Sequence, residues 1–328
     1  MSVIFLHIGS HKTGTSALQS AFAVNSGRLQ HQGVVYPAST GAADARLGRI
    51  TSGNGLRLAS YLNPQLPFGF RPEKFLSHFD RVITVANRKN ILYSSEFLEA
   101  FDAERLKEFA AHAAAHGYQC KTVYFVRSIA GHAISSYSQA VKREKVTSSF
   151  AEYLGNSYRN PFKGTIQRSD AAIGRDSILV LNYDAVRKNL LRTFLRQVCD
   201  IDSREFRQPA TVNRSLTATE IEVMRTVNAR LESRRQATLV SDALIYADPE
   251  AATNFVITAD EMLILRDLHA ADLSFVNSRI NGEQIVLRHA SIKQGKRPEL
   301  NQDELEKAAV RALALLPASP PRTADDNK

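Results

Sequence analysis

The stretch that decides the fold reads "VIFLHI" from Val3 to Ile8 and then "GSHKTGTSALQSAF" from Gly9 to Phe22. A continuous apolar run of this length is typical of a buried strand in a parallel sheet. A short loop with one lysine and several small or hydroxylated residues follows, and a helix is predicted from about Gly14. The free amides and the dipole of a helix N-terminus bind anions. This stretch therefore predicts a phosphate-binding loop.

The loop differs from that of nucleoside triphosphatases. Their G-x-x-x-x-G-K-[ST] pattern needs two glycines before the lysine, but here His11 precedes Lys12 and Leu6 occupies the position of the first glycine. The alternative to an anion site is a plain helix cap with a solvated lysine. We expect a phosphate group to be held here without a metal ion, by Gly9, Lys12, Thr13, Gly14, Thr15 and Ser16.

Strand-then-helix units recur along the first two thirds of the chain. "NILYSS" (90–95), "KTVYFVR" (121–127) and "SILVLN" (177–182) are predicted strands, and each is joined to the next by an amphipathic helix or a longer segment. Such repeats imply a three-layer α/β fold with a central parallel sheet and helices on both faces. Residues 39–67 are rich in Gly, Ala, Ser and Asn and are expected to form a long excursion over one face.

The character of the sequence changes after about residue 211, where helices dominate. Thr217 with Glu220 predicts a capping box, and two further helices are predicted over 260–275 and 302–315. We therefore expect residues 1–210 to form the α/β core and residues 211–315 a mainly helical C-terminal part packed on it. The final residues, 316–328, are expected to be a disordered tail.

The composition is that of a globular protein: 328 residues, 44% hydrophobic and 23% charged, with a formal net charge of +9. The positive charge favours an anionic partner. The basic residues are scattered, with no aromatic-interleaved basic ribbon, so a small polyanion is expected rather than nucleic acid. The oligomeric state stays open.

Cysteine content and hydropathy bear on the compartment. The two cysteines, Cys120 and Cys199, show no metal-ligand spacing and are typical of a reducing compartment. The apolar runs are strand-sized, and the start lacks the basic region of a secretory signal. We expect a cytoplasmic protein with no transmembrane segment, for which peripheral membrane association stays open.

A second candidate phosphate site follows the strand "KTVYFV", which ends at Arg127. Ligands of parallel α/β sheets bind at the carboxyl ends of the strands. Ser135 comes eight residues later, about two turns into a helix that begins near Ile129. A planar guanidinium fork and a short hydroxyl donor suit a phosphate dianion.

Together the two sites resemble a known family. "HIGSHKTGTSALQ" (7–19) paired with "VRSIAGHAISSY" (126–137) is similar to the two cofactor motifs of sulfotransferases that use 3′-phosphoadenosine 5′-phosphosulfate (PAPS). "KTGT" looks most like the bacterial carbohydrate sulfotransferases and the heparan sulfate N-sulfotransferase type, and the resemblance spans about residues 3–235. It departs where Ser128 and Ile129 replace the usual Asn-Pro, which alters the turn rather than the charge.

The resemblance implies that the first motif binds the 5′-phosphosulfate and that Arg127 and Ser135 bind the 3′-phosphate. It further implies an enzyme that transfers a sulfuryl group in line to a hydroxyl or amine of a carbohydrate or glycolipid and releases adenosine 3′,5′-bisphosphate. Lys12 would face the leaving oxygen. Glu96 is the expected base, with His11, His7 and Asp44 as rivals. A small-molecule kinase with a degenerate loop, or a nucleotide-binding protein without turnover, is the alternative.

A metal site is not expected. His112 and His116 lie one helical turn apart on an alanine-rich segment, but the neighbouring sequence supplies no third ligand.

Overall fold

A computed structural model of the chain describes residues 1–10, 13–39, 41–46, 52–66, 68–207, 215–251, 255–297 and 301–314. The chain forms two compact units. The first unit comprises Met1–His132, Asn160–Val212 and Leu268–His289, and the second comprises Ala133–Arg159, Asn213–Asp267 and Ala290–Lys328. The tail predicted over 316–328 lies outside the described residues.

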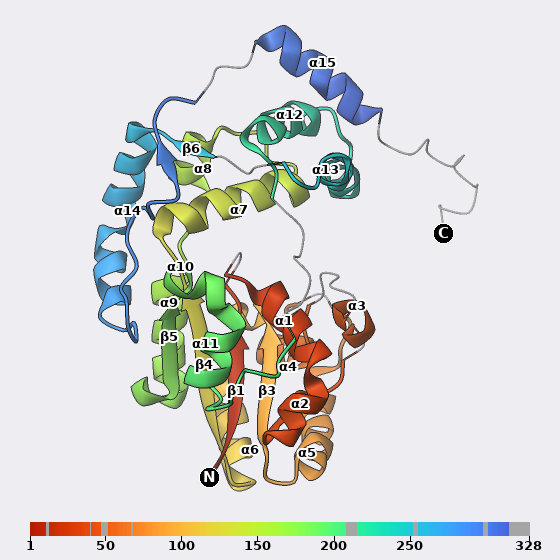
Figure 1. The fold of residues 1–328 in the computed structure, drawn as a ribbon, viewed down its shortest axis with the longest axis vertical. Helices are drawn as coiled ribbons and strands as arrows, with labels where there is room; N and C mark the ends of the chain where they lie inside the picture. Colours follow the sequence, from red (N-terminus) through yellow and green to blue (C-terminus); the bar gives the residue numbers. More distant parts are fainter. Residues whose placement is uncertain are drawn as a thin grey trace, which may run out of the picture. The chain divides into compact units, whose positions relative to one another are not determined.

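The first unit is built on a five-stranded parallel sheet in the order β2-β3-β1-β4-β5. Figure 1 labels β3, β1, β4 and β5 of this sheet. The strand that opens the chain is therefore central, with a neighbour on each side. The strands are β1 (Ser2–Ile8), β2 (Val34–Val35), β3 (Asn90–Ser95), β4 (Tyr118–Val126) and β5 (Ile178–Asn182). The predicted parallel sheet is confirmed.

Helices cover both faces of this sheet, as neighbouring residues on β4 show. Successive strand residues point to opposite faces. Phe125 stacks with Phe194 of α11 at 6.3 Å between ring centroids, whereas Tyr124 meets Phe162 of α9 edge-on at 6.0 Å. The face of Phe125 also packs against α1 and α2. These helices are α1 (Thr15–Val24), α2 (Ser26–His31), α9 (Phe162–Ile173) and α11 (Leu190–Gln197).

Two more helices, α5 (Phe75–Ala86) and α6 (Ala103–Ala115), belong to the first unit and pack against each other. Phe79 of α5 and Phe109 of α6 are fully buried, with their ring centroids 4.9 Å apart. Asp102 caps α6 by accepting a hydrogen bond from the amide of Arg105 at 3.0 Å. The three-layer α/β architecture is confirmed.

The described residues of the segment 39–67, predicted as a long excursion, contain two helices that the sequence argument did not predict. They are α3 (Ala42–Arg46) and α4 (Leu56–Leu62), and α4 buries Leu58 and Leu62. The flanking glycines and asparagines hid this helix from a propensity argument. Gly53 is needed before α4, because its φ is +73° and a Cβ would lie 2.0 Å from the carbonyl oxygen of Ser94.

The remaining helices, strands and turns connect the elements described above or form the second unit. The described residues also contain α7 (Ile129–Arg143), α8 (Phe150–Asn156), α10 (Tyr183–Val186), α12 (Ala218–Asn228), α13 (Arg234–Ala247), α14 (Ala259–Asn277), α15 (Gln302–Leu313), β6 (Val256–Ile257) and β7 (Lys293–Gln294). Short 3₁₀ turns occur at η1 (Pro72–Lys74), η2 (Glu96–Ala100), η3 (Arg175–Ser177) and η4 (Arg187–Asn189). The predicted capping box of Thr217 and Glu220 opens α12.

The two units differ from the expected division at residues 210 and 211. Residues 133–159 join the later helices, since the Asn228 amide donates to the carbonyls of Val141 and Val146 at 2.8 and 3.0 Å. Conversely, residues 268–289 return to the sheet, where the Asn281 amide donates to the Val180 carbonyl at 2.9 Å. Neither reassignment coincides with a change in the amino-acid composition of the sequence.

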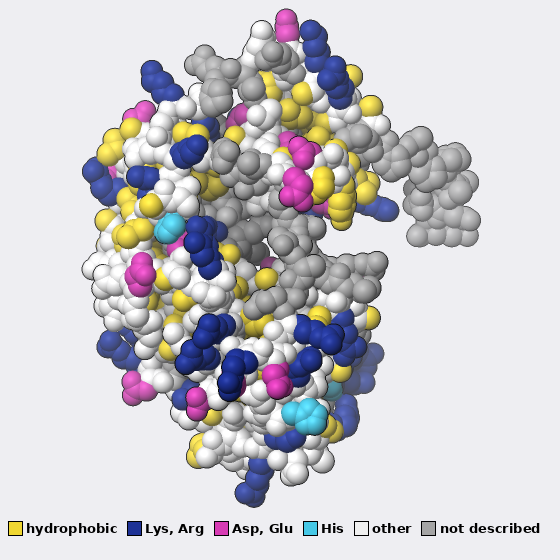
Figure 2. All heavy atoms as spheres, in the orientation of Figure 1, with side chains coloured by type: hydrophobic (Ala, Val, Ile, Leu, Met, Phe, Trp, Pro, Cys, Tyr) yellow, Lys and Arg dark blue, Asp and Glu magenta, His cyan; other side chains and the backbone are white. Residues whose placement is uncertain are grey.

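The sequence predicted scattered basic residues and no transmembrane segment. Figure 2 shows Lys and Arg side chains dispersed over the visible face, with Asp and Glu among them. None of the helices in the described parts of the chain combines the length and the hydrophobicity that crossing a bilayer requires.

His7 sits in the core rather than at a reactive position. Its Nδ1 lies 2.8 Å from Ser94 Oγ, and its ring meets Phe125 and Phe194 edge-on at 5.7 and 5.3 Å. Burial lowers the pKa of His7 from 6.5 to about 3. The imidazole is therefore neutral at physiological pH and packs as part of the hydrophobic face.

This burial predicts acid sensitivity. Between pH 6.5 and about 3 the unfolded chain binds a proton at His7 that the folded chain does not. Stability should therefore fall as the pH falls through this window, by about 1.4 kcal/mol per pH unit from this group. His7→Gln should flatten the dependence of the free energy of unfolding on pH, measured by urea titration at several pH values. An unchanged slope would show that His7 does not titrate in this way.

Candidate phosphate-binding site

The carboxyl ends of the strands meet at one edge of the first unit's sheet. Ile8 at the end of β1 is in register with Ser95 of β3 on one side and with Tyr124 of β4 on the other. Just beyond the strands, the Gly9 amide donates to the Ser95 carbonyl at 3.1 Å. The fold therefore brings the predicted loop, Glu96 and Arg127 to the same edge, as their strand-end positions required.

The loop after β1 is shaped by close backbone approaches. A Cβ on Gly9 would lie 2.4 Å from Thr15 Oγ1, so only glycine fits there without movement. Thr13 is buried and closes the turn, with its amide and its hydroxyl both donating to the Ser10 carbonyl, at 3.3 and 2.8 Å. Lys12 and His11 lie outside the described residues.

The N-terminus of α1 has no side-chain cap among the described residues. Its N-cap is Gly14, which has a φ of +77° and no side chain to satisfy the first amides. Thr15 Oγ1 is buried and has no hydrogen-bond partner among the described residues. One turn later, the nitrogen and the oxygen of the buried Gln19 side-chain amide also have no hydrogen-bond partner among the described residues. Unpaired buried donors beside free helix amides are what a bound phosphate would satisfy.

Gln19 was missed by the sequence argument. It is the last residue of the motif "HIGSHKTGTSALQ" (7–19), but its apolar neighbours predict a core face of α1, so the sequence argument gave it no role. The signal is structural: Gly53 packs so closely that a Cβ would lie 2.7 Å from Gln19 Nε2.

Arg127 follows β4 and is held in place by partners from the end of β5. Its Nη2 lies 3.6 Å from Asp184 Oδ1, and its guanidinium carbon lies 5.5 Å from the centre of the Tyr183 ring. The side chain of Arg127 is 15% exposed and that of Asp184 only 4%. Asp184 also accepts a hydrogen bond from the Ser128 amide at 2.8 Å. The guanidinium is thus oriented while part of it remains accessible.

Gly131 makes room for this arginine. A Cβ at Gly131 would lie 2.9 Å from both Nε and Nη2 of Arg127, so the guanidinium rests on the first turn of α7. Ser135 is half-buried on the same helix, which begins at Ile129 as predicted. Because Ser135 belongs to the second unit and Arg127 to the first, their pairing stays a prediction.

Glu96 is the first residue of η2 and is half-buried. Ser95 provides the cap of this turn, since its hydroxyl accepts from the Phe97 amide at 3.3 Å. A capping role, the ordinary explanation for an acid at this place, is therefore filled by its neighbour. Among the rival bases, Asp44 is exposed on α3, and His7 is neutral within the core.

A buried polar group supports the edge from the other face of the sheet. Ser10 Oγ lies 3.3 Å from His132 Nε2, and both residues are buried. The Tyr124 hydroxyl donates to Glu99 Oε1 at 2.5 Å, and burial, followed by the charge of Glu99, raises the pKa of Tyr124 well above its usual range. These contacts fix the end of β1 from which the loop departs. No sequence motif indicates them.

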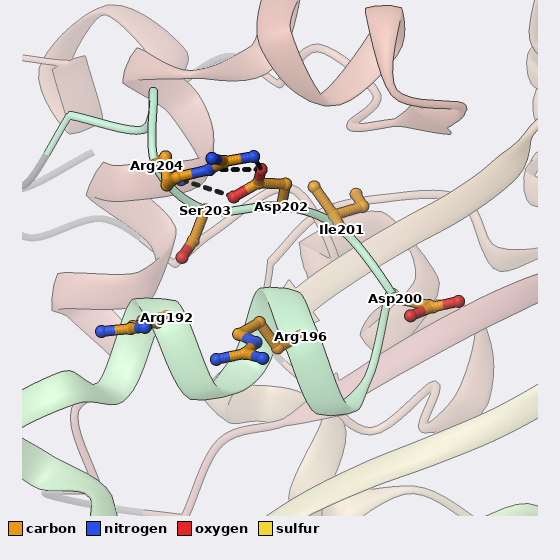
Figure 3. Close-up of a pocket in the computed structure, with 7 residues that line it drawn as sticks. All are labelled: Arg192, Arg196, Asp200, Ile201, Asp202, Ser203 and Arg204. Atoms are coloured by element: carbon orange, nitrogen blue, oxygen red, sulfur yellow. Dashed lines mark hydrogen bonds and ion pairs between the residues drawn. The ribbon is translucent and has the colours of Figure 1, made fainter.

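The first unit also has an arginine-rich hollow of about 480 Å³ on α11 and the segment after it. Figure 3 shows Arg192 and Arg196 on the helix, with Arg204 paired to Asp202 on the following segment. None of the candidate site residues lines it. The hollow is open and polar, and it lies apart from the strand ends that carry the predicted chemistry.

Comparison with known proteins gives two similar solved structures. No model of a known protein family matches the sequence, and no curated protein matches it. The crystal structure of a sulfotransferase from Alicyclobacillus acidocaldarius is 15% identical, with a TM-score of 0.41, over 75% of this chain and 96% of that one. The sulfotransferase domain of the Synechococcus PCC 7002 olefin synthase is 16% identical, with a TM-score of 0.35, over 62% and 75% of the two chains.

Proposed function

We propose that this chain is a PAPS-dependent sulfotransferase that acts on a hydroxyl or amine of a carbohydrate or glycolipid. One observation carries the proposal: an uncapped, glycine-shaped helix N-terminus after β1 lies at the same sheet edge as an oriented arginine after the adjacent strand β4. The donor has two phosphate-bearing ends. Two anion sites at the ends of neighbouring strands match that requirement, and the motifs at both positions resemble those of PAPS-using enzymes.

The chemistry needs little beyond positioning and charge. An acceptor oxygen or nitrogen forms a bond to sulfur while the bond from sulfur to the 5′-phosphate oxygen breaks. The electron pair stays on that oxygen, which leaves as part of adenosine 3′,5′-bisphosphate, and the acceptor proton passes to a base. We assign the leaving oxygen to Lys12, the 5′-phosphate to the amides of residues 13–16 and the proton to Glu96.

A kinase is the less favoured function. The loop lacks both glycines of the nucleoside-triphosphate pattern. An acidic residue does follow β5, but Asp184 is engaged by Arg127 and by the Ser128 amide, rather than presented to a metal ion. The acceptor class comes from the resemblance alone, because acceptor pockets do not follow from fold.

Calorimetry with adenosine 3′,5′-bisphosphate and with magnesium-ATP separates the two enzymes. We expect binding of the bisphosphate and little binding of magnesium-ATP, and the reverse order would favour the kinase. Transfer of labelled sulfate from PAPS to a panel of glycans then tests turnover. Bisphosphate binding without transfer to glycan, lipid or protein would indicate a nucleotide-binding protein that has lost activity.

Arg127→Ala should selectively weaken the binding of nucleotides that carry a 3′-phosphate. Hydrogen bonds to charged groups contribute roughly 1.5–3 kcal/mol, so affinity for adenosine 3′,5′-bisphosphate should fall about tenfold to a hundredfold or more. Adenosine 5′-phosphate, which has no 3′-phosphate, should bind almost as before. Ser135→Ala should show the same selectivity with a smaller loss, also measured by calorimetry.

Two variants keep this test decisive. Arg127→Ala removes the partner of the buried Asp184 and so risks the fold, whereas Arg127→Lys keeps the charge and loses only the planar fork. Arg204→Ala is the control, because Arg204 is 88% exposed and pairs with Asp202 away from the strand ends. Equal losses for both nucleotides would show that Arg127 has a structural role only.

A further inference from the structure

Three potential metal ligands converge on the surface of α5 and α6. His112 Nε2 lies 2.8 Å and His116 Nε2 lies 3.6 Å from the same atom, Asp80 Oδ1. The three ligand atoms all lie within 4.8 Å of one another, and the two imidazole centroids are 5.0 Å apart. The expectation of no metal site rested on a missing third ligand. The structure supplies one from another helix, 32 residues away in sequence.

The packing of the two helices explains the convergence. His112 and His116 are four residues apart, so they project from one side of α6 and its C-terminal end. Phe79 of α5 packs on Phe109 of α6 at 4.9 Å and on the His112 ring at 6.0 Å. Asp80 follows Phe79 on α5, and its carboxylate faces both histidines. Buried aromatic contacts thus hold the three ligands in place.

We propose that Asp80, His112 and His116 bind one transition-metal ion, with Zn²⁺ as the expected species. Imidazole nitrogen and carboxylate oxygen are ordinary zinc ligands, and three protein ligands leave a position for water. A simple His–Asp ion pair would explain His112 but gives no reason for a second imidazole directed at the same oxygen. The C-terminal end of α6 adds negative helix dipole, which favours a cation.

The ion would have a structural rather than a catalytic role. The segment from His112 to His116 has three alanines between the histidines, so it lacks the glutamate that serves as base in helix-borne zinc hydrolases. His116 immediately precedes Gly117 and the start of β4 at Tyr118, which places the cluster at the amino end of the strands. The proposed sulfuryl chemistry lies at the carboxyl end. An ion here would join α5 to α6.

Zinc titration of the untagged full-length chain tests the site by calorimetry and by thermal unfolding. We expect one ion per chain and a rise in melting temperature with zinc. Loss of a supporting group around a metal commonly weakens affinity by about 10–100-fold, so loss of a ligand should weaken it by at least tenfold. Asp80→Asn, His112→Ala and His116→Ala should each do so and should each abolish the zinc-dependent rise.

Two features of the experiment keep it conclusive. Asp80→Asn preserves size and hydrogen bonding, so its effect cannot be attributed to a failure to fold, and circular dichroism checks all variants. His78→Ala is the matched control, since His78 is also half-buried on α5 but lies outside the cluster. No zinc uptake by the wild type overturns the proposal. So does uptake that Asp80→Asn leaves unchanged, or that His78→Ala weakens equally, because the binding is then adventitious.

Discussion

Glu96→Gln should lower the turnover number for sulfuryl transfer by about 10²–10⁴-fold, the usual contribution of a positioned general base. The amide keeps the shape of the side chain and removes its ability to accept the acceptor proton. Because Glu96 is assigned to the acceptor rather than to the nucleotide, the dissociation constant of adenosine 3′,5′-bisphosphate should stay nearly unchanged. Labelled-sulfate transfer to the acceptor that the wild type modifies gives the rate, and calorimetry gives the affinity.

Two further variants test whether Glu96, and not another candidate base, accepts the proton. Glu104→Gln changes a 79% exposed carboxylate on α6 and should leave the rate unaltered. His11→Gln tests the alternative base in the loop. If His11→Gln lost turnover at constant nucleotide affinity while Glu96→Gln stayed active, the proton would have to pass to His11, and the assignment of Glu96 would be wrong.

Lys12→Ala should reduce turnover by about 10²–10³-fold or more, which is the scale measured when a donor to a developing oxyanion is removed. The negative charge on the leaving oxygen is greater in the transition state than in bound PAPS. The loss in turnover should therefore exceed the loss in affinity for adenosine 3′,5′-bisphosphate. Single-turnover kinetics with labelled PAPS measure the first, and calorimetry measures the second.

Lys107→Ala serves as the comparison for Lys12, because Lys107 is 64% exposed on α6 and forms a long ion pair with Glu104. Near-normal turnover of Lys12→Ala would show that the loop lysine is a solvated side chain at a helix cap. Equal losses of affinity and turnover would instead assign Lys12 to ground-state binding.

The sequence was sufficient to predict the parallel sheet, because its strands carry local signals. The predicted strands β1, β3, β4 and β5 are short runs of mostly buried residues, and parallel connections allow few arrangements of such runs. The same logic placed Gly9, Glu96 and Arg127 at one edge, where the structure puts them. The capping box at Thr217 could likewise be predicted, because a cap depends on residues three positions apart.

Features that depend on contacts between distant segments could not be predicted from the sequence. Asp184 holds Arg127, and His132 meets Ser10 across 122 residues, without any motif that relates them. The third ligand at Asp80 was missed for the same reason. The division into units also depends on which helices exchange contacts, so the membership of residues 133–159 and 268–289 left no trace in local composition.

The central position of β1 has a consequence for biosynthesis. β1 is synthesised before both of its neighbours, which lie at residues 90–95 and 118–126, so its ladder is incomplete until residue 126 has been made. At about 5–20 residues/s, that takes roughly 6–25 s. During this time an apolar segment with unpaired edges is available for wrong pairing. A nascent chain stalled before β4 would therefore need the protection of a chaperone, whereas one stalled after β4 would already bury its first strand.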